Sequence, residues 1–125
     1  MILGVGIDVV HVYRLERWQN ITGLMARFFH PDELKSSIPK GETGILSLAA
    51  RFAAKEAFGK ALGTGLRNIN LRDIAVMNRE DGKPVMNLYG SAAKAFASFG
   101  GRKIFVSLSH ERRDALAVVI IEGEA

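Results

Sequence analysis

The sequence ILSLAARFAAKEAFGKAL at residues 45–62 is followed directly by Gly63-Thr64-Gly65. Alanine, leucine, lysine and glutamate are strong helix formers, and glycine is the residue that most often follows the end of a helix. The segment therefore predicts a long helix that ends at Leu62, and we expect the rest of the chain to pack against it.

The predicted helix has two unlike halves when its residues are placed at intervals of about 100°. One arc holds small and apolar side chains, those of Ala53, Ala54, Ala57, Phe58 and Ala61. The opposite half holds three cations and one carboxylate, on Arg51, Lys55, Glu56 and Lys60. A solvated face with a Glu56–Lys60 pair accounts for this pattern, and composition alone favours that interpretation. The alternative is a polyphosphate site, in which the cations neutralise phosphate oxygens and Glu56 binds a divalent metal.

The N-terminal segment Ile2–Val10 is rich in isoleucine, leucine and valine, and it predicts a strand. Gly4 and Gly6 within it indicate the close approach of another backbone. Asp8 interrupts the apolar run, and a carboxylate beside buried residues requires a cation, a hydrogen-bond donor or water. Bonding to nearby backbone N–H groups explains Asp8 as well as metal ligation does. Asp8 and Glu56 together would suit Mg²⁺, which usually takes few carboxylates from a protein and completes its shell with phosphates and water.

Short helices and strands alternate along the rest of the chain. Helices are predicted at residues 12–18, from Pro31, and from a Ser91 cap to Phe99, and residues 36–44 are predicted to form a loop. Two strand pairs are predicted, one at 73–77 and 84–89 around a turn at 80–83, the other at 103–109 and 115–121. Closely spaced strands favour antiparallel pairing. The sequence therefore predicts one α+β domain of residues 1–125, in which an antiparallel sheet packs against one long helix.

Composition narrows the classes of protein and partner. No apolar stretch approaches the roughly 20 residues of a membrane span, and the absence of cysteine excludes disulfides. The first residues lack the basic flank and cleavage site of a secretory signal, which favours the cytoplasm. Seventeen lysines and arginines against thirteen acidic residues give a net charge of +4. This charge favours an anionic partner such as a nucleotide, an acidic protein or a nucleic acid.

Three motifs along the chain occur together in one known family. They are Gly4-Val5-Gly6-Ile7-Asp8, the segment from Arg51 to Ala57 with Lys60, and Ser107-Leu108-Ser109-His110. In this order they resemble the motifs of the holo-acyl carrier protein synthases, which are 4′-phosphopantetheinyl transferases. Residues 28–34 and 82–84 also fit that family, so the resemblance covers nearly the whole chain.

The resemblance implies a homotrimer with active sites at the subunit interfaces. It also implies coenzyme A as the donor, Mg²⁺ as the metal and acyl carrier protein as the acceptor. By their positions in the motifs, Asp8 and Glu56 match the metal ligands and, with Lys60, the catalytic residues. The residues that match contacts to coenzyme A are Arg51, Lys55, Lys60, Gly82, Lys83, Pro84 and His110.

The implied reaction is attack of a carrier serine hydroxyl on the β-phosphate of coenzyme A, with release of adenosine 3′,5′-bisphosphate, in fatty acid biosynthesis. Arg14 and Arg27 match basic residues that dock the carrier. Water, Glu56 and His110 are all candidates for the base that takes the serine proton. Gly59 stands where relatives often have a helix former, and it should cost the helix up to about 1 kcal/mol relative to alanine. The alternative is that its missing side chain lets a phosphate approach the backbone.

The main alternative is a non-catalytic module that binds nucleotide or RNA through the same basic residues. RNA-binding sheets carry aromatic side chains on which bases stack. Phe52 and Phe58 lie instead in the predicted helix, and no predicted strand has alternating aromatics. A purely structural trimer would explain the alanine-rich helix but not Asp8.

Overall fold

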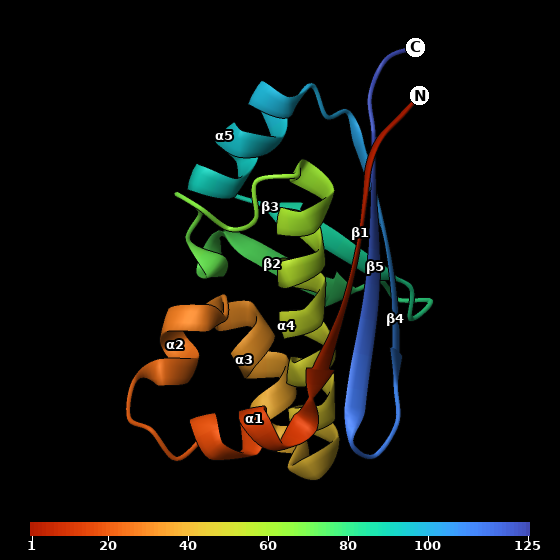
Figure 1. Cartoon of the computed structure of the whole chain (residues 1–125). Helices are drawn as coiled ribbons and strands as arrows, with labels where there is room; N and C mark the ends of the chain where they lie inside the picture. The colour runs from red at the N-terminus through yellow and green to blue at the C-terminus, as the bar shows by residue number, and fades with distance from the viewer.

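The long helix expected from the sequence is α4, Glu42–Leu62, which runs through the middle of the computed structural model (Figure 1). The structure describes all residues 1–125. Fifteen of the 21 residues of α4 are buried, including Arg51 and Lys55. A helix that is buried on several sides has no broad solvated half, so the predicted solvated face does not exist as one surface. None of the helices is both long enough and apolar enough to span a membrane.

Three antiparallel strands form the main sheet: β1 (Ile2–His11), β4 (Lys103–His110) and β5 (Asp114–Glu122). Their order is β1-β5-β4, so the first and last strands of the chain pair and the two termini lie close together (Figure 1). The class is α+β with antiparallel strands, as predicted. One face of the sheet packs on α4, and there β5 contributes four fully buried side chains, those of Ala115, Ala117, Val119 and Ile121.

Backbone packs against backbone where β1 crosses α4, as the glycines of β1 predict. A Cβ atom at Gly4 would overlap the carbonyl oxygen of Ala61, and one at Gly6 would overlap the carbonyl oxygen of Ala57. Only glycine permits so close an approach. The strand therefore lies directly on the helix, without an intervening layer of side chains.

The opposite face of the main sheet is apolar and uncovered. Successive side chains of a strand point to opposite faces, so the residues between the glycines of β1 point away from α4. Val5, Ile7 and Val9 are 57%, 55% and 54% exposed, and Phe105 of β4 is 46% exposed. Val5 and Phe105 flank Ile120 of β5 in the sheet register. The chain alone leaves this continuous apolar surface in water.

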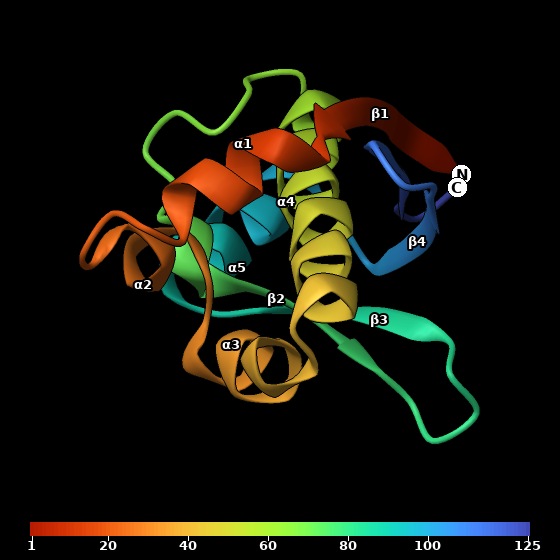
Figure 2. The same cartoon turned by 90° about the horizontal axis from the view of Figure 1, so that it is seen from below.

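A separate hairpin consists of β2 (Ile74–Asn78) and β3 (Pro84–Leu88), which pair antiparallel as predicted. The turn between them, residues 79–83, is exposed and projects from the body of the molecule (Figure 2). β3 also contacts β4. The hairpin therefore extends alongside the main sheet.

Four shorter helices complete the fold, together with two 3-10 turns at 38–40 and 71–73: α1 (Val12–Trp18), α2 (Leu24–Phe28), α3 (Pro31–Ser37) and α5 (Gly90–Phe99). α1, α2 and α3 gather near the N-terminal half of α4, while α5 lies to one side of it, near its C-terminal end (Figure 1). α2 has no counterpart among the predicted elements, because five residues are too few to show a helical period.

The prediction of a loop at residues 36–44 is wrong. Most of these residues are helical, and α4 already begins at Glu42. Gly44 lies inside α4. A Cβ atom at this position would overlap the carbonyl oxygen of Ser37, so the contact requires glycine. The glycine that reads as a loop signal thus marks a close contact between α3 and α4.

The prediction that Ser91 caps α5 is also wrong, since the cap position belongs to Tyr89. Asp73 accepts hydrogen bonds from the Ser91 N–H (2.9 Å) and hydroxyl (2.6 Å). These bonds hold the pKa of Asp73 below its usual value. Asp73 therefore satisfies the first turn of α5 from outside the helix.

Gly59 is buried, and the group that approaches it belongs to the chain itself. The Gly65 N–H donates to the Gly59 carbonyl at 3.0 Å, and a Cβ atom at Gly59 would lie 2.7 Å from the Gly65 carbonyl carbon. The expected approach of a phosphate at this position is wrong, because the loop after α4 already occupies the space.

The contact of β1 with α4 yields a stability prediction. We expect Gly6→Ala to lower the free energy of unfolding by about 1–3 kcal/mol, because the added methyl group must push the strand off the helix. Urea unfolding at matched protein concentration measures the effect. Ile2→Ala, an exposed position on the same strand, should cost less than about 1 kcal/mol. Equal losses in the two variants would contradict the close-contact explanation.

Candidate functional site

Asp8 lies on the face of β1 that packs against α4. Gly4, Gly6 and Asp8 follow one another at intervals of two residues, so they lie on the same face of the strand. Of the three, only Asp8 has a side chain that can bind a ligand. Its carboxylate accepts a hydrogen bond from Lys60 Nζ at 2.9 Å, and the same ammonium donates to the Ile7 carbonyl at 3.2 Å. The side chain of Asp8 is only 17% exposed, whereas that of Lys60 is 54% exposed. Lys60 thus reaches over Asp8 from solvent.

Glu56 lies next to this pair, one helical turn before Lys60. Partial burial raises the pKa of Glu56, and the nearby charge of Asp8 raises it further, while Arg14 and Lys60 act in the opposite direction. The hydrogen bond to Asp8 raises the pKa of Lys60. We call Asp8, Arg14, Glu56 and Lys60 the Asp8 cluster. It combines two carboxylates that repel each other with two cations that partly compensate for them.

The donor set of the Asp8 cluster fits a magnesium ion. No group of three or more histidine, cysteine or acidic side chains is placed to bind a metal anywhere in the chain. Mg²⁺ does not require such a group, because it retains water and commonly uses one or two protein carboxylates together with substrate phosphates. Burial raises the pKa of Glu56 first, and the charge of Asp8 adds to this shift; a bound divalent cation would offset both effects, because it favours the ionised carboxylates.

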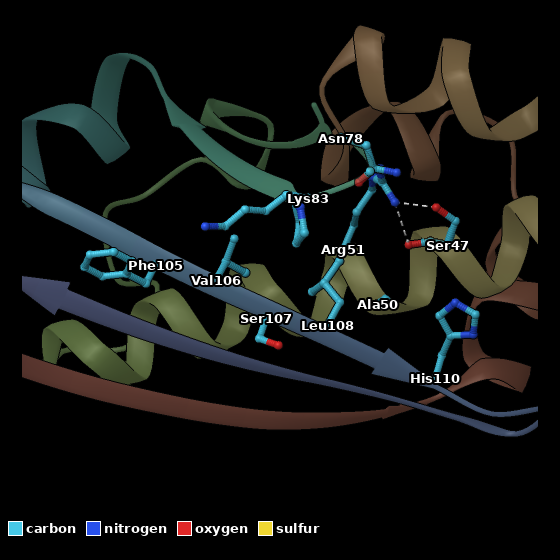
Figure 3. Close-up of a pocket in the computed structure, with 12 residues that line it drawn as sticks. Ser47, Ala50, Arg51, Asn78, Lys83, Phe105, Val106, Ser107, Leu108 and His110 are labelled. Carbon is cyan, nitrogen blue, oxygen red and sulfur yellow. Dashed lines mark hydrogen bonds between the residues drawn. The ribbon is translucent and has the colours of Figure 1, made fainter. Parts of the chain in front are cut away.

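A cavity of about 530 Å³ lies between the N-terminal half of α4, the β2–β3 hairpin and β4 (Figure 3). Five of the seven residues that match contacts to coenzyme A line it: Arg51, Gly82, Lys83, Pro84 and His110. They come from three segments that are far apart in the chain. Phe105, Val106 and Leu108 add apolar surface to the wall. The cavity therefore combines cationic and apolar groups, as a site for a nucleotide requires.

The guanidinium of Arg51 is fixed on one side by the backbone. Its Nε donates to the Val76 carbonyl at 2.7 Å, and its Nη1 donates to the carbonyl (3.4 Å) and hydroxyl of Ser47. The bonds to Ser47 are visible in Figure 3. Burial lowers the pKa of Arg51, and the attraction of Glu33 opposes this shift. Arg51 thus belongs both to the interior and to the cavity wall.

Lys55, expected to contact phosphate, is fully buried instead. Its ammonium donates to Glu33 Oε1 at 2.6 Å, to the Leu71 carbonyl at 3.0 Å and to the Ile74 carbonyl. These bonds use all three N–H donors of the ammonium. Burial lowers the pKa of Lys55, and the charge of Glu33 opposes this shift. The expected contact of Lys55 with phosphate is therefore wrong for this structure, in which Lys55 contacts only groups of the protein interior.

The helical wheel grouped residues that the structure separates. Arg51 and Lys55 are one turn apart and face β2, whereas Glu56 and Lys60 are one turn apart and face β1. The two pairs differ by about 100° around the helix, since Lys55 and Glu56 are consecutive residues. An arc as wide as half a helix can therefore serve two unconnected sites.

Sequence reasoning missed three residues. Glu33 lies in the first turn of the helix that was predicted from Pro31, and it is fully buried and pairs with Lys55. Its spacing of three residues from His30 is that of a capping box, and its Oε1 does accept from the His30 N–H at 2.9 Å. Ser47 and Asn78 line the cavity, and no motif in the sequence marked them.

The two arginines expected to dock a carrier lie in different surroundings. The Arg14 guanidinium lies 5.1 Å from the centre of the Trp18 ring and 5.6 Å from that of Phe52, and its charge acts on Glu56. Arg27 is exposed in the last turn of α2. Arg14 therefore borders the Asp8 cluster, whereas Arg27 is a surface cation.

The site residues form two groups within one chain. None of Asp8, Glu56 and Lys60 lines the cavity that Arg51 and His110 share. A ligand that uses both groups must reach from one to the other, or a second copy of the chain must bring them together.

Comparisons with known proteins agree along nearly the whole chain. A family model described as the 4′-phosphopantetheinyl transferase superfamily matches residues 4–119. The holo-[acyl-carrier-protein] synthase of Treponema denticola is 55% identical over 123 residues, which is 98% of this chain and all of that protein. The solved synthase of Neisseria meningitidis has a TM-score of 0.85 and 35% identity, over 98% of this chain and 99% of that one. The synthase of Bacillus anthracis, solved with CoA (3′,5′-ADP), has a TM-score of 0.83 and 32% identity, over 99% of both chains.

The burial of Lys55 yields a second stability prediction. We expect Lys55→Met to lower the free energy of unfolding by about 3–5 kcal/mol, because it leaves the Glu33 carboxylate buried without its cation. The Arg79–Asp81 pair is a matched control, since both of its side chains are more than half exposed. Arg79→Met should cost less than about 1 kcal/mol. Urea unfolding measures the free energy of unfolding of both variants. If Lys55→Met loses as little as Arg79→Met, the assignment of Lys55 to a buried ion pair with Glu33 is contradicted.

Proposed function

The chain belongs to the 4′-phosphopantetheinyl transferase superfamily, and from this premise we propose that it transfers 4′-phosphopantetheine from coenzyme A to a serine of an apo-acyl carrier protein. The activity is that of a holo-[acyl-carrier-protein] synthase, and the second product is adenosine 3′,5′-bisphosphate. The observation that carries the proposal is the cavity, which collects Arg51, His110 and the segment 82–84 from distant parts of the chain.

The adenosine end of coenzyme A suits this cavity. Arg51, Lys83 and His110 provide cationic or hydrogen-bonding groups for phosphate oxygens, and Pro84 and the apolar wall provide surface for a planar base. A synthase of this family has been solved with CoA (3′,5′-ADP) bound, which supports coenzyme A as the substrate. The expected role of His110 near the 3′-phosphate remains part of this proposal.

Asp8 and Glu56 are the residues that would hold Mg²⁺. A magnesium ion at this position would supply positive charge to the phosphate oxygens and so stabilise the charge that develops during transfer. Lys60, which is about half exposed and hydrogen-bonded to Asp8, adds a second positive charge at the same place. No protein nucleophile is required, because phosphoryl-type transfer depends mainly on positioning and on charge stabilisation.

The serine oxygen forms a bond to the β-phosphorus as the bond from that phosphorus to the bridging oxygen of the α-phosphate breaks. The bridging oxygen leaves with adenosine 3′,5′-bisphosphate. His110 lies in the cavity, where we assign it to the cofactor. The serine proton therefore passes to Glu56 or to a water beside it. Arg14, at the border of the Asp8 cluster, and Arg27 on α2 are the cations that we assign to docking of the acidic carrier.

We further propose that three copies of the chain assemble and share their active sites. Two observations support this assembly. The outer face of the main sheet leaves Val5, Ile7 and Val9 more than half exposed, and a surface of this kind marks an interface. The cavity and the Asp8 cluster are separate in one chain, so a neighbouring subunit can place its own cluster beside the cavity.

The direct test is incubation with coenzyme A, Mg²⁺ and an apo-acyl carrier protein, followed by intact-mass spectrometry of the carrier. We expect the carrier to gain the mass of one phosphopantetheine group. A carrier whose target serine is replaced by alanine is the control and should stay unmodified. A known synthase, run in parallel on the same carrier, is the positive control. If that synthase modifies the carrier completely and this chain leaves the carrier unmodified, the proposed activity is refuted.

The metal assignment predicts the behaviour of two isosteric variants. We expect Asp8→Asn and Glu56→Gln each to lower the transfer rate by on the order of 100-fold or more, because each removes a negative charge from the metal site. A chelator should abolish transfer by the wild type, and added Mg²⁺ should restore it. Glu124→Gln, at an exposed carboxylate near the C-terminus and outside both groups of site residues, is the control and should keep the wild-type rate. Wild-type rates in either cluster variant at limiting Mg²⁺ would show that the metal binds elsewhere.

The shared-site trimer predicts subunit complementation. Light scattering should give a mass about three times that of the 13.7 kDa chain, and Ile7→Asp should give inactive monomers because it buries a charge in the interface. Asp8→Asn and a His110→Ala/Lys83→Ala double variant should each be poorly active alone. Unfolded together and refolded in equal amounts, they should recover up to about one quarter of the wild-type rate, because random assembly pairs an intact cluster with an intact cavity at that frequency. No recovery in mixed trimers would place each complete site within one chain.

A further inference from the structure

One edge of β2 is covered by charged side chains where a neighbouring strand would otherwise pair. β3 pairs with one edge of β2, and no strand pairs with the other. Ile74 and Val76 are two residues apart, so their backbone groups point to the same edge. There Lys55 donates to the Ile74 carbonyl, Glu33 Oε2 accepts from the Val76 N–H at 3.0 Å, and Arg51 donates to the Val76 carbonyl at 2.7 Å. Three side chains thus satisfy a buried strand edge.

Glu33 and Lys55 are closed off from any ligand in the cavity. Both are fully buried, and no buried polar side-chain atom in the structure lacks a partner. Glu33 bonds to α3, α4 and β2 through His30, Lys55 and Val76. The pair therefore connects three elements, and it can affect a ligand only through the positions of those elements.

Arg51 depends on the same strand. Val76 donates its N–H to Glu33 and accepts the Nε–H of Arg51 through its carbonyl, so one peptide segment joins the buried pair to the cavity wall. The hairpin that contains Val76 also carries Gly82, Lys83 and Pro84 to the other side of the cavity. A two-stranded hairpin has little stability of its own, so its position depends on what holds its edge.

We propose that Glu33 and Lys55 are positioning residues for the coenzyme A cavity: their buried ion pair fixes the edge of β2 on α4 and thereby sets the distance between Arg51 and the hairpin turn. The inference rests on the proposed function, because it names coenzyme A as the occupant of the cavity. Lys55 then acts on the cofactor without touching it. Without the pair, the hairpin occupies the binding position only part of the time, and the apparent affinity falls by that fraction.

The test uses the double variant Glu33→Gln/Lys55→Met, which removes both charges and keeps the side-chain lengths. Coenzyme A binding is measured by calorimetry without carrier, over a range of salt concentrations, beside steady-state kinetics. We expect the dissociation constant and the KM for coenzyme A to rise about tenfold, which corresponds to a hairpin in place about one tenth of the time. The kcat at saturating coenzyme A should stay within about twofold of wild type, because the Asp8 cluster is unchanged.

The salt dependence separates positioning from direct contact. Lys83→Ala, which removes an exposed cation from the cavity wall, should flatten the dependence of affinity on salt, because one screened ionic contact is lost. The double variant should bind more weakly with the wild-type salt dependence. A flattened dependence in the double variant would make Lys55 a phosphate ligand and overturn the proposal. Unchanged affinity for coenzyme A would overturn it as well.

Two further measurements keep the proposal falsifiable. If the double variant does not fold, the single variant Glu33→Gln, which retains one acceptor oxygen, replaces it. This variant must also raise the dissociation constant for coenzyme A. Wild-type affinity of Glu33→Gln for coenzyme A would refute the proposal. Amide hydrogen exchange at Val76 and along β2 follows the anchoring without any ligand. Protection of these amides should fall in the variants, and unchanged protection would refute the anchoring. A wild-type protein that does not bind coenzyme A would instead refute the proposed function, while this exchange result would still test the anchoring.

Discussion

The backbone of β1 lies directly on the backbone of α4, and the Asp8 cluster depends on that contact. Gly4 and Gly6 face the carbonyl oxygens of Ala61 and Ala57, and the next residue on the same face is Asp8. A larger residue at either glycine would increase the distance between strand and helix. The carboxylate of Asp8 could then no longer act on the side chains of the helix as it does here. The three defined residues of the motif Gly-x-Gly-x-Asp therefore act together: the two glycines set the distance between β1 and α4, and this distance places the aspartate beside Glu56 and Lys60.

α4 distributes its polar residues between two sites by their angle around the helix axis. Arg51 and Lys55 face β2, and Glu56 and Lys60 face β1. The two pairs share one rigid helix, so the cavity and the Asp8 cluster keep a fixed relation. The lysines of the two pairs differ in burial and therefore in role. Lys55 is saturated by hydrogen bonds and serves the fold, whereas Lys60 keeps a mainly exposed side chain and can reach a ligand.

The sequence predicted what depends on neighbouring residues and on short repeats. The α+β class, the hairpin around Gly82 and the close approach at Gly4 and Gly6 all follow from local propensity or from the lack of a side chain. The burial of Lys55 could not be predicted in this way, because its partner Glu33 is 22 residues away and looks like an ordinary acid at a helix start. Family resemblance did not reveal it either, since a motif gives the identity of a residue and not its accessibility. The loop predicted at residues 36–44 failed for a related reason: a glycine signals a turn and a close helix contact equally well.

Assembly and catalysis meet on the two faces of β1. The alternation of the strand places Gly4, Gly6 and Asp8 against α4 and leaves Val5, Ile7 and Val9 pointing away from it. A strand that carries the Asp8 carboxylate on one face and an uncovered apolar row on the other cannot shift in an interface without shifting the carboxylate. In the proposed trimer, subunit contacts on the apolar row would therefore fix the Asp8 cluster relative to the neighbouring cavity. Under the proposed function, each chain of 125 residues would contribute its Asp8 cluster to one active site and its cavity to another. Because α4 and β1 connect the two groups within a chain, the symmetry of the assembly would then set how they meet.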